Sequence, residues 1–237
     1  MTQAKEIFKT LIQSANPDIA EHSQRFFKTG EGDYGAGDKF LGIRVPVIRK
    51  LVKQSKQASM ADAVELISNE YHEVRLFAVL LMVHFFERSK NDEAQQEEIV
   101  SAYLANTAFI NNWDLVDSSA HKILGKYLFN KDRTLLFKLA KSASLWERRI
   151  SMMSTYYFIK QGQFEDTFKI AEILLDDNHD LIHKIVGWML REVGNKNKLA
   201  EENFLKSHYV NMPRTMLRYA IEKFPKEERE LYLKGKI

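Results

Sequence analysis

Apolar residues recur at spacings of three and four along almost the whole chain, which is the periodicity of amphipathic helices. Only four prolines and ten glycines interrupt this pattern, so it predicts an all-helical fold. The first two helices are expected over residues 2–14 and 17–28. A third is expected to begin at Pro46, because proline suits the first helical turn, and to run to about Gln54.

A glycine-rich stretch, residues 29–38, separates the second and third expected helices. Within it, residues 30–35 match the GxGxxG spacing of dinucleotide-binding loops. That fingerprint holds a pyrophosphate only between a strand and a helix, whereas this stretch follows a helical pattern and carries Glu31 and Asp33. We therefore interpret the stretch as a mobile loop, open to contact with a ligand.

From there on, the chain has the pattern of helix pairs joined by short polar turns, and the second helices of the pairs begin alike. Their equivalent positions lie about 42, 32, 35 and 34 residues apart, which is the range of helical-hairpin repeats. The pattern predicts an α-solenoid of HEAT-like repeats, forming a single domain over residues 1–237, in which the second helices line one concave groove. The equivalent positions are Arg75, Asp117, Arg149, Lys184 and Arg218.

Four of these five positions are basic and the fifth is Asp117, which predicts a basic groove with one chemically different point. An equally weighted interpretation is that the basic residues face solvent or pair with acids in the adjacent repeat. Net charge does not decide between the two, because 35 lysines and arginines are nearly balanced by 32 acidic residues, for a charge of +3.

The stretch from Asn111 to Ala120 places Trp113 and Asp117 four residues apart, on the same face of an expected helix. Taken alone, the pair is explained by a core tryptophan and a solvated aspartate. Trp188 follows Lys184 by four residues, so it lies on the same side of its helix. An aromatic surface beside basic residues suits stacking against a sugar or a base, and a repeat core explains it equally well.

The composition excludes disulfides and thiolate metal sites, because the chain has no cysteine, and a reducing compartment is expected. The first residues lack the apolar region of a signal peptide and no apolar run is long enough for a membrane span, so we expect a cytoplasmic protein. His179 and His183 have zinc-ligand spacing, but helix capping explains them better, so no metal site is expected.

Five segments in this order resemble the AlkD-type DNA alkylation-repair glycosylases, a family built of HEAT-like repeats. The resemblance spans most of the chain. It implies excision of positively charged alkylpurines, such as N7-alkylguanine and N3-alkyladenine, from duplex DNA without a metal or cofactor, and a lesion that stays in the helix. The segments are residues 40–46, 113–117, 146–149, 187–192 and 213–218.

By position, the resemblance implies that Asp117 is the catalytic aspartate, with Trp113 and Trp188 as groove tryptophans and Arg149 as the arginine beside the lesion. Counting from Trp146 selects Arg149 over its neighbour Arg148. Asp117 is expected to offset the positive charge of the sugar and to orient water, with cation–π help from the tryptophans.

The remaining site residues are expected to contact DNA, mostly its phosphates. Phe26 stands where a relative has a tyrosine near the damaged nucleotide, which puts a hydroxyl contact there in doubt, and the loop over residues 30–37 is longer than in that relative. The expected DNA-contacting residues are Phe26, Arg44, Arg148, Lys184, Arg191, Arg214, Thr215 and Arg218.

We expect a monomer that binds duplex DNA containing alkylated purines, in the cytoplasm and associated with the nucleoid when bound. Two alternatives remain. One is a non-catalytic relative that recognises bent, branched or damaged DNA, which the joint presence of Trp113, Asp117, Arg149 and Trp188 argues against. The other is a protein-binding α-solenoid scaffold, which is favoured if the basic residues of the groove are paired with acids.

Overall fold

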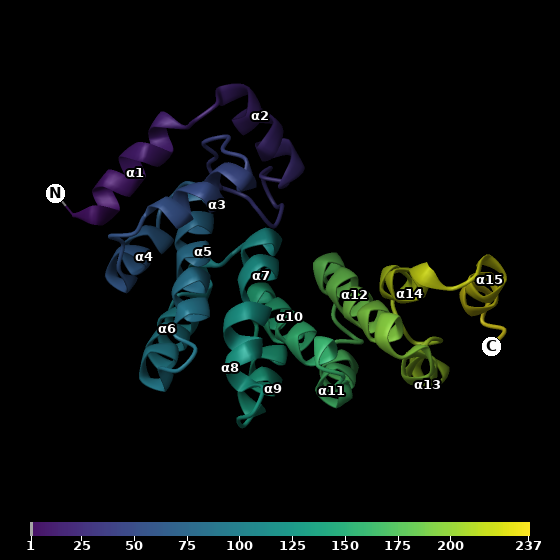
Figure 1. Ribbon diagram of the computed structural model, residues 1–237. Coiled ribbons are helices and arrows are strands. Elements are labelled where there is room, and N and C mark those ends of the chain that lie inside the picture. Colours follow the sequence, from purple (N-terminus) through teal and green to yellow (C-terminus); the bar gives the residue numbers. More distant parts are fainter. Residues whose placement is uncertain (1) are drawn as a thin grey trace. The chain divides into compact units, whose positions relative to one another are not determined.

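The computed structural model describes residues 2–237, and the regular secondary structure in this range is helical (Figure 1). Lys39 and Tyr71 form an isolated bridge, and no β-strand occurs among the described residues. The all-helical prediction is therefore confirmed. The chain divides into two compact units, Met1–Ser119 and Ala120–Ile237. The expectation of a single domain over residues 1–237 stays a prediction.

The first unit is organised around one long helix. Its elements are α1 (Gln3–Gln13), α2 (Pro17–Phe26), α3 (Val45–Gln54), α4 (Met60–Ile67), α5 (His72–Arg88), α6 (Glu93–Ala105), η1 (Thr107–Phe109) and α7 (Trp113–Ser119). Helix α5 is apolar around most of its circumference and is buried along most of its length, as such a helix requires. It packs against α3, α4, α6 and α7.

The predicted N-terminal helices differ from the observed ones only at their ends. Helices α1 and α2 replace the expected ranges 2–14 and 17–28, and α3 begins one residue before Pro46. Helix α2 stops at Phe26 because Lys28 adopts a left-handed backbone with φ of 52°, which ends a right-handed helix.

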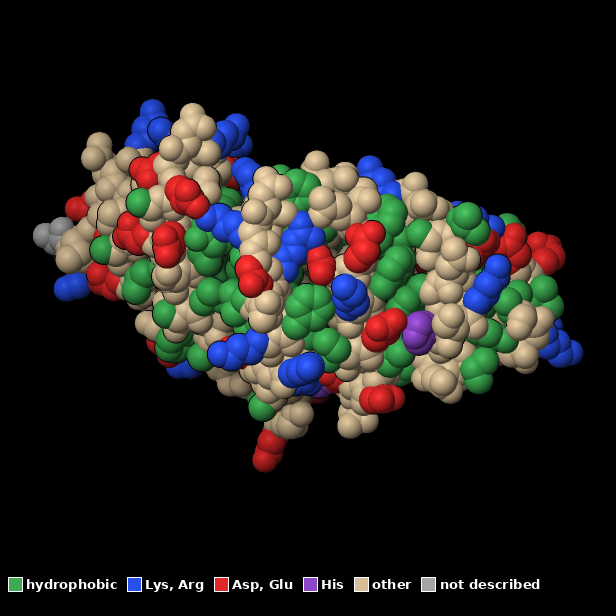
Figure 2. Space-filling view, turned by 90° about the horizontal axis from the view of Figure 1, so that it is seen from below, with side chains coloured by type: hydrophobic (Ala, Val, Ile, Leu, Met, Phe, Trp, Pro, Cys, Tyr) green, Lys and Arg blue, Asp and Glu red, His purple; other side chains and the backbone are tan. Residues whose placement is uncertain are grey.

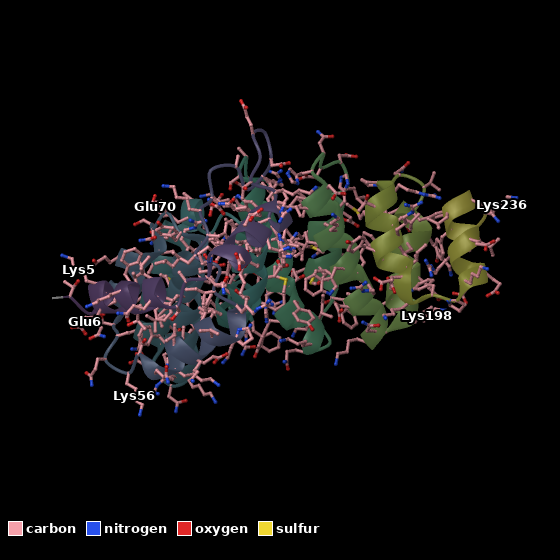
Figure 3. All side chains as sticks on the ribbon, turned by 90° about the horizontal axis from the view of Figure 1, so that it is seen from above. Lys5, Glu6, Lys56, Glu70, Lys198 and Lys236 are labelled. Carbon is pink, nitrogen blue, oxygen red and sulfur yellow. The ribbon has the colours of Figure 1, made fainter. Side chains whose placement is uncertain are left out.

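The loop between α2 and α3 (Figure 3) is anchored by one buried carboxylate. Glu73 accepts the N–H groups of Leu41, Gly42 and Ile43 at 2.8, 2.7 and 3.2 Å. A Cβ at Gly42, where φ is +78°, would lie 2.0 Å from the carbonyl oxygen of Asn16, so only glycine fits. The loop connects two helices, so the strand that a dinucleotide fingerprint requires does not precede it.

The second unit is a succession of packed helix pairs. Its elements are η2 (His121–Gly125, a π-helical turn), α8 (Lys126–Leu128), α9 (Thr134–Ala140), α10 (Leu145–Lys160), α11 (Glu165–Ile173), α12 (Asp180–Lys196), α13 (Lys198–His208), α14 (Arg214–Ala220), η3 (Ile221–Lys223) and α15 (Lys226–Lys234). Helix α10 packs on α9, α11 and α12, and α12 packs on α13 and α14. Gly187 lets α12 and α14 approach closely, because a Cβ there would lie 2.3 Å from the Met216 carbonyl oxygen.

The predicted repeat pattern matches these helices. Each of the five equivalent positions lies within the first two turns of α5, α7, α10, α12 or α14, which are the second helices of successive pairs. The helical-hairpin organisation is therefore confirmed. None of the helices in residues 2–237 combines the length and the apolar composition needed to cross a membrane.

Candidate functional site

Trp113 opens α7 and belongs to an aromatic cluster of the first unit. Its half-buried ring stacks on Phe27 with ring centroids 5.4 Å apart and an interplanar angle of 23°. Phe26 meets the same indole edge-on, with centroids 5.9 Å apart. Both arrangements are favourable for aromatic pairs. Because Phe26 is 58% exposed, the cluster is partly open to solvent.

A buried network of charged groups lies beneath this cluster. His72 Nε2 donates to Asp114 Oδ2 at 2.9 Å, and His72 Nδ1 is 3.4 Å from Asp38 Oδ2. Arg75 Nη2 donates to Asp38 Oδ1 at 2.7 Å and also binds the carbonyl oxygens of Asn69 and Glu70. The network joins the first turn of α5 to the first turn of α7 and to the end of the loop.

His72 is the protonated centre of this network. Burial by itself lowers the pKa of His72, but the charge of Asp114 and the hydrogen bonds to Asp114 and Asp38 outweigh burial and raise this pKa from 6.5 to about 9. Burial opposes ionisation of Asp38 as well, yet its bond with His72 and the charge of Arg75 lower the pKa of that carboxyl. Both ring nitrogens of His72 therefore donate at neutral pH.

The aromatic cluster and the charged network share the His72 ring. Phe40 stacks on the imidazole with centroids 4.8 Å apart, and Phe27 lies at the same distance with a larger tilt. Phe27 thereby packs between His72 and Trp113. A protonated imidazole beside phenyl rings gains cation–π attraction. The orientation of Trp113 thus depends on the buried charges as well as on apolar packing.

Asp117 lies one turn after Trp113 on α7, so the two side chains share a face of the helix. Its side chain is half-buried. Burial raises the pKa of Tyr103, and the negative charge of Asp117 adds to that increase. Tyr103 forms a hydrogen bond of 2.9 Å with Ser119, also on α7. The structure thus places the two central predicted residues, Trp113 and Asp117, on one short helix of the first unit.

A cavity of about 630 Å³ lies next to the aromatic cluster. The sequence offered no pocket motif, because the lining comes from segments that are far apart in the chain: α2, the end of the loop with the start of α3, and the starts of α5 and α7. The volume is within the range of small-molecule binding sites. The lining residues are Asp18, Ile19, His22, Ser23, Phe26, Phe27, Phe40, Ile43, Arg44, Val45, Pro46, His72, Glu73, Leu76 and Asp114.

In the second unit, Trp188 belongs to a separate aromatic group. Its half-buried ring lies 6.2 Å from that of Tyr156, and its Nε1 donates to Glu192 at 3.0 Å. Lys160 Nζ lies 4.8 Å above the Tyr156 ring. The indole of Trp188 is thus held in a defined orientation by a hydrogen bond and a neighbouring ring.

The two candidate arginines of α10 both bind the backbone of their own unit. Arg149 is only 4% exposed, and its Nη1 donates to the carbonyl oxygen of Leu181 at 2.7 Å. Arg148 Nε donates to Asp177 at 2.6 Å, and its Nη1 donates to the carbonyl oxygens of Ser142 and Ala143. Arg149 is therefore held inside the second unit, where it binds the backbone that begins α12.

Arg75 requires correction as a groove residue. Its side chain is 4% exposed and is occupied by Asp38 and by two backbone carbonyls, so it stabilises the first unit from within. Acidic side chains engage three further predicted residues: Asp180 binds Lys184 at 2.6 Å and also Thr215, while Glu222 pairs with Arg191.

The predicted DNA-contacting arginines that are exposed are Arg44, Arg214 and Arg218, of which Arg214 also binds the Leu233 carbonyl oxygen at 2.6 Å. On the molecular face shown in Figure 2, basic and acidic side chains are interspersed. Among the predicted basic DNA contacts, full exposure is therefore limited to these three arginines.

The His179–His183 pair has a structural role. His179 is the N-cap residue of α12, and its Nδ1 accepts the N–H of Leu181 at 3.1 Å, while His183 Nε2 binds the carbonyl oxygen of Asp177. Helix capping thus accounts for the spacing of the pair. Within residues 2–237, no group of three or more potential metal ligands is assembled.

The sequence interpretation missed Phe27, Asp38, His72 and Asp114 as parts of the site. His72 is separated by 34 residues from Asp38 and by 42 from Asp114 in the sequence, so no local motif links them. One signal was present: His72, Glu73 and Arg75 begin an otherwise apolar helix, and buried charged groups require partners.

The sequence model of the family described as DNA alkylation repair enzyme matches residues 7–224. A similar solved structure, from Enterococcus faecalis, is described as a predicted DNA alkylation repair enzyme. It has a TM-score of 0.68 and 18% sequence identity, covers 90% of this chain and 98% of its own, and at this identity supports the fold alone. None of the curated proteins compared with the chain matches it.

Proposed function

Since the chain belongs to the DNA alkylation repair enzyme family, we propose that it is a monofunctional DNA N-glycosylase for positively charged alkylpurines. Family membership supports a role in the repair of alkylation damage, with DNA as the partner. The observation that carries the finer proposal is the placement of Trp113 and Asp117 one turn apart on α7, beside the exposed ring of Phe26.

The proposed substrates, N7-alkylguanine and N3-alkyladenine, carry a positive charge on the purine ring. When the bond between C1′ and the ring nitrogen breaks, its electron pair remains with the purine, which leaves as a neutral base without an acid to protonate it. Water forms the new bond to C1′ and releases one proton. The products are the free alkylpurine and an abasic site. The sugar develops oxocarbenium character, and this charge is what the protein must stabilise.

Asp117 supplies the stabilising negative charge. A half-buried carboxylate interacts with a developing cation more strongly than a fully solvated one, because water screens it less. The same carboxylate accepts a hydrogen bond from the attacking water and orients the water toward C1′. No metal or cofactor takes part in the proposed reaction.

Trp113 adds an electron-rich face next to the sugar. Cation–π attraction contributes roughly 0.5–2 kcal/mol, provided that the ring is held in place. Phe27 and, through it, the His72 network hold the ring. Trp188 has the same proposed role in the second unit, where Tyr156 and Glu192 orient it.

The exposed arginines Arg44, Arg214 and Arg218 bind phosphates in this proposal, and these contacts fix the position of the duplex without reading its sequence. Arg148, Lys184, Arg191 and Thr215 reach the DNA by exchanging their present partners. The ion pairs of Lys184 and Arg191 are partly exposed and therefore weak, so a phosphate competes for them. Arg148 must also release Asp177, a more buried partner. Arg149 acts as a positioning residue, because it holds the first turn of α12, on which Lys184 lies.

Base release from methylated duplex DNA tests this proposal. Wild-type protein is expected to release 7-methylguanine and 3-methyladenine in the presence of a metal chelator, and Asp117→Asn is expected to lose most of this release. Asp176→Asn is the matched control, since it changes an exposed carboxylate in a turn of the second unit. Absence of release by the wild type, or unaltered release by Asp117→Asn, contradicts the proposal.

A protein-binding scaffold is the second candidate, and the pairing of Arg148, Lys184 and Arg191 with acidic residues favours it. Duplex binding at graded salt concentrations separates the candidates. Phosphate contacts give an affinity that falls steeply as salt rises, whereas a scaffold binds duplex DNA little at any salt concentration. Salt-dependent binding without base release would indicate the non-catalytic DNA-binding relative.

A further inference from the structure

We propose that Lys122 and Lys160 form a phosphate-binding site in the second unit, which holds one phosphate of the DNA backbone beside the ring of Tyr156. Neither lysine is among the residues that the sequence pattern predicts as DNA contacts. The inference rests on the proposed function, because the ligand is duplex DNA. Three features of the second unit carry it: the packing that brings the lysines together, their lack of an acidic partner, and the aromatic rings beside them.

A glycine brings the segments of the two lysines together. Lys122 lies in the π-helical turn η2, and Lys160 is the last residue of α10. A Cβ at Gly125 would lie 2.3 Å from the carbonyl oxygen of Ser154, so only glycine lets η2 pack this tightly against α10. Turns of the π-helical type occur frequently at functional sites. The tight packing places Lys122 close enough for its charge to act on Lys160.

The two lysines carry positive charges that no acidic side chain neutralises. None of the ion pairs formed within residues 2–237 includes Lys122 or Lys160. Arg148, Lys184 and Arg191, in contrast, each pair with an acid. Loss of hydration at the amine, together with the charge of Lys122, lowers the pKa of Lys160. Two like charges held close together favour an anion that contacts both.

Aromatic rings orient the amine of Lys160 without neutralising it. Its Nζ lies 4.8 Å from the ring centroid of Tyr156 and 5.8 Å from that of Tyr157. Tyr156 in turn contacts His121 edge-on at 5.3 Å and Trp188 at 6.2 Å between centroids. Cation–π attraction at an exposed site contributes only about 0.5–1 kcal/mol. The exposed amine of Lys160 is therefore available to a more strongly bound anion.

Glu192 is the acid that acts on this aromatic group, and it is already engaged. Its carboxylate accepts Trp188 Nε1 at 3.0 Å and the side-chain amide of Asn195 at 3.3 Å. Burial, and then the charge of Glu192, raises the pKa of Tyr156, whereas the charge that shifts the pKa of Lys160 is that of Lys122. Glu192 thus fixes the indole of Trp188 and leaves the lysines to bind an external anion.

The ligand is a phosphate diester in the backbone of duplex DNA. Its two non-bridging oxygens accept one hydrogen bond from each ammonium group, and lysine binds phosphate as a point charge. The ring of Tyr156 offers an apolar face to the adjoining deoxyribose. Such a contact positions the duplex on the second unit without reading its sequence. Free inorganic phosphate shares this oxyanion chemistry, so the experiment compares the two sources.

The salt dependence of binding to an unmodified duplex tests the site. Each phosphate contact contributes about 0.9 to the slope of log affinity against log salt. Lys160→Ala is expected to lower this slope by roughly 1, and additional loss of Lys122 is expected to lower it no further, because both lysines bind one phosphate. Lys206→Ala, which replaces an exposed lysine of α13, should leave the slope unchanged. An unchanged slope in Lys160→Ala, or a loss of about 2 in the double variant, overturns the shared site.

Two substitutions of Lys160 separate its charge from its packing against Tyr156. Lys160→Arg keeps the charge and is expected to keep the wild-type salt slope. Lys160→Met keeps the apolar stem and is expected to match Lys160→Ala. Equal losses in Lys160→Arg and Lys160→Met would mean that packing, and not charge, accounts for the effect, and would overturn the proposal.

Competition with inorganic phosphate at constant ionic strength identifies the source of the anion. Duplex affinity of the wild type is expected to be unaffected, because a single free phosphate lacks the other contacts of the duplex. A decrease that the wild type shows and Lys160→Ala does not would assign the site to free phosphate and overturn its assignment to DNA.

Base release separates this inference from the proposed function. If the wild type releases alkylpurines while Lys160→Ala keeps the full salt slope, the phosphate site fails and the glycosylase proposal stands. If Lys160→Ala lowers the slope but the wild type releases no alkylpurine, the phosphate site stands and the glycosylase proposal fails.

Discussion

His72 Nε2 donates to Asp114 Oδ2 at 2.9 Å, which ties the first turn of α5 to the first turn of α7. Asp114 immediately follows Trp113, so a buried imidazolium of the core determines where the proposed catalytic helix begins. Removing one partner of a buried ion pair is strongly destabilising, because the remaining buried charge then lacks its partner. The position of Trp113 is therefore coupled to the stability of the first unit.

Stability should depend on pH through His72. Its pKa is raised from 6.5 to about 9, so the folded protein binds this proton more tightly than the unfolded chain does. The resulting stabilisation is fully present below pH 6.5 and is lost as the pH rises through about 9, with a total on the order of 3 kcal/mol. Urea unfolding at pH 6, 7.5 and 9.5 measures this loss. The His72→Gln substitution should make the free energy of unfolding depend less on pH. The His22→Gln substitution, which replaces an exposed histidine, should leave this pH dependence in place.

Asp117→Asn should reduce base release by about 10²- to 10³-fold, because it removes a charge that stabilises the transition state. Duplex affinity should change little, since a carboxylate does not attract phosphates. Single-turnover release and fluorescence anisotropy measure the two quantities. By contrast, Asp114→Asn should lower the free energy of unfolding by about 3–5 kcal/mol, because it deprives protonated His72 of a buried partner. Equal destabilisation by both substitutions would argue that Asp117 is structural.

Arg218→Ala should affect mainly duplex binding, whereas Arg149→Ala should also affect stability. Arg218 is exposed, so its loss should weaken duplex binding and lower the slope of log affinity against log salt by roughly 1. Arg149 is buried against the Leu181 carbonyl, so its loss should reduce stability, affinity and base release together. Arg229→Ala, an exposed change beyond the matched residues 7–224, is the control. A salt slope that Arg218→Ala leaves unchanged would remove Arg218 from the phosphate contacts.

Glu201 should make the second unit less stable as the pH rises. It is 1% exposed, and burial, with the charge of Glu202, raises its pKa from 4.5 to about 8. The folded protein therefore binds the proton of this carboxyl more tightly than the unfolded chain does. The resulting stabilisation is present below pH 4.5 and is lost as the pH rises through about 8. Glu201→Gln keeps the shape without the charge, so it should raise stability at pH 9 by about 1–3 kcal/mol. Thermal unfolding at pH 5 and 9 checks this, with Glu227→Gln, which changes an exposed carboxylate of α15, as control.

Local periodicity was sufficient to predict the helices and their pairing. The spacing of apolar residues, Pro46 and the glycine-rich loop are local signals that can be read from neighbouring residues. They located α1, α2 and α3 to within two residues at their ends. The same spacing placed Trp113 and Asp117 on one helix, because four residues complete about one turn. Equivalent positions in α5, α7, α10, α12 and α14 followed from the repeat length alone.

Burial and pairing were decided by tertiary structure. Arg75 and Arg149 belong to the same periodic series as the exposed Arg218, yet both are buried. Arg75 binds the carboxylate of Asp38, which is 37 residues away, and Arg149 binds the carbonyl oxygen of Leu181, which is 32 residues away. The cavity likewise combines α2, the loop and the starts of α5 and α7. The sequence determined which segments form helices and which faces they share, since those depend on short-range spacing. Which charges are neutralised, and where a cavity opens, depends on contacts between distant segments, and those exist only in the folded chain.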